Sequence, residues 1–125
     1  MRLLRDLSAY DIGQSAILSG ERVVAVEGPE GTDRMIARAA RLERGWGLRR
    51  LPRAGVLVKG PKLGQDLRVD LPAVGARTIV NAARAGLRGV AVTSGLTLVL
   101  NVAETVQAAD RLGLFLVGIP QENAA

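Results

Sequence analysis

The chain has 125 residues, a formal net charge of +5 and 48% hydrophobic residues, and it contains neither cysteine nor histidine. This composition excludes disulfides, zinc sites of the Cys/His type, thiol nucleophiles and His-based catalytic triads. Acid–base or metal chemistry must then depend mainly on the 12 aspartates and glutamates, whose oxygen ligands suit Mg²⁺ or Mn²⁺ bound together with a substrate phosphate.

The first half of the chain is predicted to begin with two strands that form a hairpin around Ser19-Gly20, because glycine suits a tight turn. A helix follows, with Thr32 as its candidate N-cap and Gly45 as its stop. The short apolar run that follows Gly55 is typical of a buried strand. The predicted elements are strands over residues 12–18 and 22–27, a helix over 32–43 and a strand over 56–58.

The segment Gln65–Pro72 is the strongest candidate in the sequence for a site that binds a cation or a phosphate. In an extended conformation Asp66, Arg68 and Asp70 share one side, and apolar residues occupy the other. Two carboxylates can hold a hard divalent cation, and an arginine can bind a phosphate. Two ordinary alternatives stay open. The segment can be a solvated strand face whose charges compensate one another, and Asp70 can cap the turn into the next helix.

The second half is predicted to repeat the order of the first. A second hairpin is expected around Ser94-Gly95, and Asn101 with Glu104 has the spacing of a capping box for the helix that follows it. The last apolar run is expected to be a buried strand. The predicted elements are a helix over residues 77–85, strands over 90–93 and 97–100, a helix over 101–112 and a strand over 114–119.

The predicted fold class is α/β, with a mixed sheet and helices packed on it in one compact domain over residues 1–125. No apolar run reaches the ~18 residues that a membrane span needs, and charges appear too early in the sequence for a signal peptide. We therefore expect a soluble, cytoplasmic domain.

The basic residues of the chain are nearly all arginine, and most of them are dispersed. Only 2% of the residues are aromatic, so there is little on which nucleic-acid bases could stack, and no nucleic-acid partner is expected. One arginine cluster surrounds Trp46. It is either a solvated loop or a contact for an acidic lipid surface or a phosphate. Its members are Arg41, Arg44, Arg49, Arg50 and Arg53.

Four motifs occur in an order that resembles the C-terminal domain of the LpxI-type UDP-2,3-diacylglucosamine pyrophosphatases. The resemblance spans nearly the whole chain, including the apolar runs near its end. Residues 60–64 depart somewhat from the pattern of the family. The motifs are residues 11–15, residues 26–33 with Val26-Glu27 and Glu30-Gly31-Thr32-Asp33, residues 55–59, and residues 65–72 with Gly75.

The resemblance implies an activity in lipid A biosynthesis in Gram-negative bacteria. Such enzymes hydrolyse UDP-2,3-diacylglucosamine to UMP and 2,3-diacylglucosamine 1-phosphate (lipid X), with a divalent metal and water attack on the α-phosphorus. They act in the cytoplasm, peripherally on the inner face of the inner membrane. The family has a further N-terminal domain and a site between the two domains. This chain is therefore expected to lack that domain and to supply only the C-terminal half of the site.

The resemblance and the local chemistry together give the predicted site. Asp66 and Asp70 are expected to hold Mg²⁺ or Mn²⁺ or to orient water, with Asp66 slightly favoured, and Arg68 to neutralise the pyrophosphate. The helix start after Gly31 offers backbone N–H groups to an anion. The expected substrate-binding residues are Gln14, Ser15, Glu30, Gly31, Thr32, Asp33, Lys59, Lys62 and Gln65.

Two other functions remain open from the sequence. The chain can be a non-catalytic module that binds a phosphorylated sugar or nucleotide and presents it to a partner domain. It can also be an oligomerisation domain whose polar motif is ordinary surface. Lysines beside a strand end are usually only solvated, and a glycine-rich turn followed by a cap would explain residues 27–33 without any ligand.

Overall fold

The computed structural model describes residues 2–7, 13–20, 22–45, 55–61 and 71–120. Short strands alternate with helices along these ranges. In chain order the elements are α1 (Arg2–Leu7), β1 (Ser15–Ser19), β2 (Arg22–Val26), α2 (Thr32–Gly45), β3 (Gly55–Lys59), β4 (Ala73–Val74), α3 (Ala76–Arg84), β5 (Gly89–Thr93), β6 (Leu98–Val99), α4 (Val102–Leu112) and β7 (Phe115–Ile119).

Five of the strands form a mixed sheet in the order β2-β1-β3-β5-β7. Strand β1 is antiparallel to both of its neighbours, whereas β3, β5 and β7 are parallel to one another. Strands β2, β3, β5 and β7 therefore end at the same side of the sheet, which we call the carboxyl edge. Strands β4 and β6 form a separate two-stranded parallel sheet. The mixed α/β fold predicted from the sequence is confirmed.

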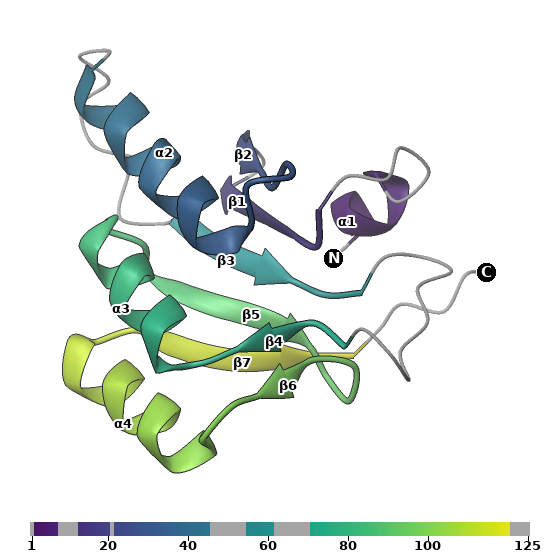
Figure 1. Cartoon of the computed structure of the whole chain (residues 1–125), viewed down its shortest axis with the longest axis vertical. Coiled ribbons are helices and arrows are strands. Elements are labelled where there is room, and N and C mark those ends of the chain that lie inside the picture. Colours follow the sequence, from purple (N-terminus) through teal and green to yellow (C-terminus); the bar gives the residue numbers. More distant parts are fainter. Residues whose placement is uncertain (1, 8–12, 21, 46–54, 62–70, 121–125) are drawn as a thin grey trace.

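Helices α2, α3 and α4 cover one face of the five-stranded sheet, side by side in chain order (Figure 1). Alternation along the strands directs Ile17, Leu57 and Val90 to this face, where they are fully buried in the main core. Leu4 of α1 packs with Ala16, Val58 and Ala91 on the opposite face. None of the described helices is long and apolar enough to cross a membrane.

Local signals placed most of the elements correctly. The first hairpin forms with a short irregularity between Ile17 and Leu18, and β3 lies where the apolar run predicted it. Gly86 follows α3 with φ +80° and Gly113 ends α4 with φ +73°, so both glycines occupy the left-handed region that side chains avoid.

The predicted second hairpin is wrong. All five residues of β5 are buried, and β3 and β7 flank it in parallel, so both of its edges are already paired. Strand β6 cannot pair with it and joins β4 instead. The repeat of a hairpin-plus-helix unit that the sequence suggested is therefore absent from this fold.

Three further local expectations need correction. Asn101 adopts a left-handed conformation (φ +44°) and makes no side-chain cap bond, so the capping box does not form. Thr32 is the first residue of α2 and directs its hydroxyl to another residue. The last strand is less buried than predicted, because β7 lies at an edge of the sheet: Phe115, Val117 and Ile119 are exposed.

Candidate active site at the carboxyl edge of the sheet

Polar side chains converge where β2 and β3 end and β1 begins. Ser15 is paired with Lys59 in the β1–β3 register, and its carbonyl accepts a 2.9 Å hydrogen bond from the Glu27 N–H. Residues two positions before or after these three point into the main core on the helical face. By the same alternation, the side chains of Ser15, Glu27 and Lys59 lie on that face, beside the start of α2.

Glu27, Ser15 and Thr32 form a hydrogen-bonded group that we call the Glu27 cluster. Glu27 Oε2 accepts hydrogen bonds from Ser15 Oγ at 2.5 Å and from Thr32 Oγ1 at 2.9 Å. The two hydroxyl oxygens are 3.1 Å apart. Ser15 and Thr32 are buried and Glu27 is half-buried, so the carboxylate is held in one orientation by hydroxyls that have little access to competing water.

The position of the Glu27 side chain depends on Gly13. The Gly13 N–H donates to the Glu27 carbonyl at 2.9 Å. A Cβ at position 13 would lie 2.5 Å from Glu27 Cγ and 2.7 Å from its carboxyl carbon. Glycine therefore leaves the space that the carboxylate side chain fills, and a larger residue would displace it.

Lys59 ends β3 next to this cluster. Burial lowers its pKa, while the negative charges of Glu27 and Asp33 oppose that shift. The ammonium group is thus partly desolvated, and it feels the charge of two carboxylates that lie outside its own strand. A lysine in such a position can act as a compact positive charge toward a phosphate oxygen.

The loop between β2 and α2 is fixed by Arg38. Its guanidinium donates to the Val26 carbonyl at 3.0 Å and forms a 2.7 Å ion pair with Glu30. The hydrogen bond from Arg38 to the Glu30 carboxylate lowers the pKa of Glu30. Gly31 has φ +90°, which glycine allows at no steric cost. The loop that precedes α2 therefore has a defined path over the start of the helix.

Asp33 connects α2 with α3. Its carboxylate lies 3.7 Å from Arg77 Nε and accepts a 3.4 Å hydrogen bond from the Thr78 hydroxyl. Both partners belong to the first turn of α3, whose N-cap, Gly75, has no side chain to offer. The negative charge beside a helix N-terminus is favourable, so Asp33 has a structural role as well as a place beside the site.

The structure brings some of the predicted site residues together. Ser15, Thr32 and Lys59 lie at one point of the carboxyl edge, whereas Glu30 and Asp33 face arginine partners. Gln14 takes part through its carbonyl, which accepts a 3.0 Å bond from the Gly60 N–H. The other predicted residues lie outside the described ranges and remain predictions: Lys62, Gln65, Asp66, Arg68 and Asp70.

Glu27 is the residue that the sequence-based site left out. Its position gave a usable signal, because an acidic residue that directly follows an apolar strand and precedes a glycine-rich loop lies at a strand's carboxyl end.

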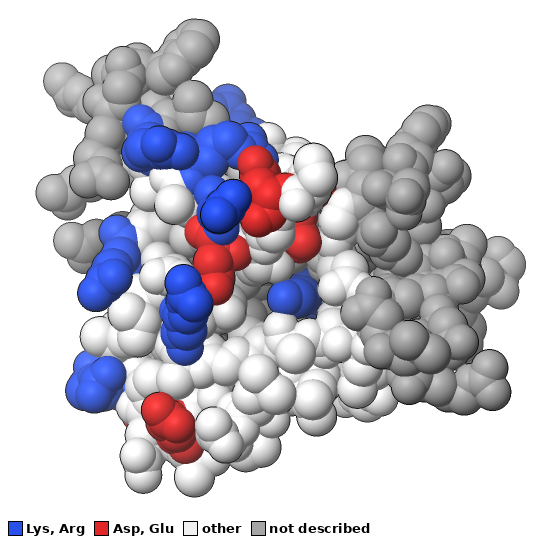
Figure 2. Space-filling model, in the orientation of Figure 1, with Lys and Arg blue, Asp and Glu red and all other residues white. Residues whose placement is uncertain are grey.

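Within the described ranges, no three acidic residues lie close enough together to hold a metal ion. Figure 2 shows acidic side chains gathered near the middle of the helical face, with basic ones around them.

Comparison with known proteins supports the family resemblance. Residues 1–117 match the family model described as the LpxI C-terminal domain. The chain is also 47% identical over 120 residues to the UDP-2,3-diacylglucosamine pyrophosphatase LpxI of Caulobacter vibrioides. That alignment covers 95% of this chain but 43% of the Caulobacter protein, so the chain spans less than half the length of this relative.

Proposed function

Because the chain belongs to the LpxI family, matching its C-terminal domain, we propose that it supplies the C-terminal half of a UDP-2,3-diacylglucosamine pyrophosphatase. The reaction is hydrolysis to UMP and lipid X in lipid A biosynthesis. The observation that carries the proposal is the 47% identity to an enzyme of that name over nearly the whole chain. The Glu27 cluster and Lys59 at the carboxyl edge agree with it, since ligand sites of open α/β sheets lie at that edge.

In this proposal water attacks the α-phosphorus. A new P–O bond forms to the water oxygen, the bond to the bridging oxygen breaks, and the sugar 1-phosphate leaves with that oxygen. Lys59 and Arg68 balance the charge of the pyrophosphate. Among the described residues, both hydroxyls that donate to the Glu27 carboxylate reach Oε2, so in this proposal Oε1 is the oxygen that meets a water molecule or a sugar hydroxyl.

A divalent cation fits the donor chemistry only if residues beyond the described ranges take part. Glu27, Glu30 and Asp33 are each engaged with hydroxyl or arginine partners. Asp66 and Asp70 are the residues that would hold Mg²⁺ or Mn²⁺. When bound, such an ion neutralises charge that develops on phosphate oxygens.

The substrate carries two acyl chains, so we also propose that the protein acts peripherally on the cytoplasmic face of the inner membrane. The remaining half of the site would come from a domain that precedes this one in the full-length relative. A binding role without turnover is the second candidate. It is favoured by the 43% coverage of the Caulobacter enzyme, since this chain then corresponds to only part of the protein that is named for the activity.

The first test follows the phosphorus NMR spectrum of UDP-2,3-diacylglucosamine with this chain and Mn²⁺ or Mg²⁺, with and without EDTA. Metal-dependent formation of UMP and lipid X by the chain alone would show that this domain contains the whole catalytic apparatus. Line broadening of the lipid phosphates without turnover would assign it the binding role. If the spectrum showed neither turnover nor line broadening, both proposals would be contradicted.

Variants in a full-length relative test the residues, numbered here as in this chain. Asp66→Asn or Asp70→Asn is expected to lower kcat by at least ~10²-fold if that residue holds the metal or water. Glu27→Gln, which keeps the shape of the side chain, is expected to lower turnover as well. The matched control is Glu104→Gln on the exposed face of α4, which should be neutral. Normal turnover in both aspartate variants would overturn their assignment.

A further inference from the structure

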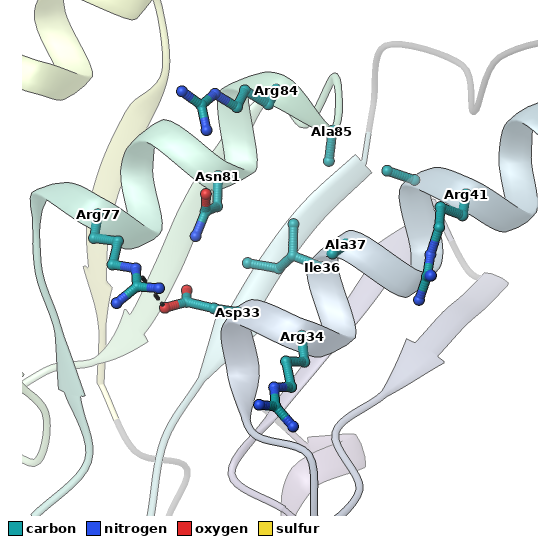
Figure 3. Close-up of a pocket in the computed structure, with 10 residues that line it drawn as sticks. Asp33, Arg34, Ile36, Ala37, Arg41, Arg77, Asn81, Arg84 and Ala85 are labelled. Atoms are coloured by element: carbon teal, nitrogen blue, oxygen red, sulfur yellow. Dashed lines mark ion pairs between the residues drawn. The ribbon is translucent and has the colours of Figure 1, made fainter.

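A groove of about 570 Å³ lies between α2 and α3 on the helical face of the sheet (Figure 3). We call it the arginine groove, because four of the residues that line it are arginines and only one is acidic. Its apolar residues are Ile36, Ala37, Ala40 and Ala85, with Asn81 beside them. The charged residues are Arg34, Arg41, Arg77, Arg84 and Asp33.

The arginines are regularly placed on the two helices. Arg34 and Arg41 lie about two turns apart on α2, and Arg77 and Arg84 lie about two turns apart on α3. All four are exposed. The single carboxylate of the groove, Asp33, already has Arg77 and Thr78 as partners, so it compensates little of the positive charge along the rest of the groove.

The directions of these side chains indicate what kind of anion fits. Figure 3 shows Arg77 turned toward Asp33, Arg84 directed away from α2, and Arg34 and Arg41 directed away from α3. The guanidinium groups line the two rims and do not converge on one point. A single small phosphate could meet few of them, whereas an extended array of phosphates could meet them all.

We propose that the arginine groove is the surface on which this domain contacts an anionic bilayer, with the guanidinium groups on headgroup phosphates. The argument is charge complementarity, spread over two helices that lie side by side. Arg41 also belongs to the arginine cluster that the sequence marked as a candidate contact for acidic lipid, and here it lines one rim of the groove.

This inference deepens the proposed function and rests on it for its purpose, since Asp33 lines the groove and its charge also acts on Lys59 at the candidate site. A domain held at the membrane by α2 and α3 would keep the carboxyl edge close to a lipid-linked substrate. The contact itself requires no turnover. Binding to vesicles that contain no substrate therefore tests the groove separately from the hydrolase activity.

The experiment is co-sedimentation of this chain with vesicles of phosphatidylcholine alone or mixed with phosphatidylglycerol. Binding is expected only to the anionic vesicles and should weaken as salt is added. The double variant Arg41→Gln/Arg84→Gln should bind about 30-fold more weakly, because each basic residue near an anionic surface contributes roughly a fivefold factor and the two factors multiply. Ala37→Glu, which places a carboxylate in the groove, should also weaken binding.

The matched control is Arg88→Gln/Arg111→Gln, which removes the same charge from exposed positions outside the groove. It should retain most of the affinity, and circular dichroism should show all variants folded. Equal losses in the groove and control variants would overturn the proposal in favour of general charge attraction. Failure to bind anionic vesicles would also overturn it. So would equally tight binding of soluble glycerol phosphate, which would assign the groove to a free ligand.

Discussion

Two buried threonine hydroxyls differ, because only one of them has a described hydrogen-bond partner. The Thr32 hydroxyl is buried and donates to the Glu27 carboxylate. The Thr97 hydroxyl oxygen is also buried, yet it has no hydrogen-bond partner within the described part of the chain. A buried polar group is costly unless it is paired, so these two residues should contribute to stability with opposite sign.

Replacing each threonine by valine, which keeps its shape, tests this difference. Thr32→Val is expected to lower the free energy of unfolding by about 1–3 kcal/mol, because the carboxylate loses a donor. Thr97→Val should be neutral or slightly stabilising, because it removes an unpaired hydroxyl. Urea unfolding followed by circular dichroism measures both. Similar losses in the two variants would contradict the hydrogen-bond network described for the Glu27 cluster.

Lys59 should make stability depend on pH in a definite direction. Burial lowers its pKa in the folded state, so between that value and the ordinary one the unfolded chain binds more protons. The contribution of Lys59 to stability therefore rises as the pH rises through this window. At neutral pH the charged, partly buried lysine lowers the stability of the folded protein. A role of this charge in binding a phosphate would explain why a lysine occupies the position.

Lys59→Met is accordingly expected to raise the Tm at pH 7 by about 2–4 °C while it weakens phosphate binding. The gain over the wild type should shrink between pH 7 and pH 10. Thermal unfolding of both proteins across this range is the measurement. A constant difference in Tm, or a lower Tm for the variant at pH 7, would show that Lys59 is not desolvated as described.

At the scale of elements, the site depends on how closely the start of β1 approaches the end of β2. Gly13 lies against the Glu27 side chain, whereas a Cβ at Gly28, one residue after Glu27, would meet only Glu30 Oε1, at 3.8 Å. Neither glycine has a positive φ. The two positions therefore differ mainly in the space that surrounds them.

Gly13→Ala is expected to destabilise the protein by about 1–3 kcal/mol, because the added methyl group overlaps Glu27. Gly28→Ala should change stability by less than about 0.5 kcal/mol. In a full-length relative, turnover should fall with Gly13→Ala and stay near normal with Gly28→Ala. Wild-type stability and turnover in both variants would contradict the claim that Gly13 positions the Glu27 side chain.

At the scale of the whole molecule, two unlike surfaces belong to different parts of the chain. The arginine groove lies between α2 and α3, on one part of the helical face. Of the ten exposed large hydrophobic residues in the described ranges, eight lie between Leu98 and Ile119, in and around β6, α4 and β7. Scattered apolar residues are ordinary on a surface, but this concentration gives the last part of the chain a different character.

The sequence by itself determined the features that depend on neighbouring residues. An apolar run flanked by glycines predicted β3. Glycines predicted where α3 and α4 end, because the left-handed turn after a helix favours glycine. The motifs of the family also identified the chain, and they pointed to Ser15, Thr32 and Lys59 before any fold was known. These signals are local, or they are carried by the order of residues alone.

The tertiary structure decided everything that depends on partners distant in the sequence. Whether residues 97–100 pair with β5 was set by the edges that β3 and β7 had already occupied, and no turn signal reports that occupancy. The placement of Glu27 between two hydroxyls required β1, β2 and α2 to meet at one edge, with Gly13 leaving the room. The same holds for the arginine groove, whose rims belong to helices that come together only because both pack on one sheet.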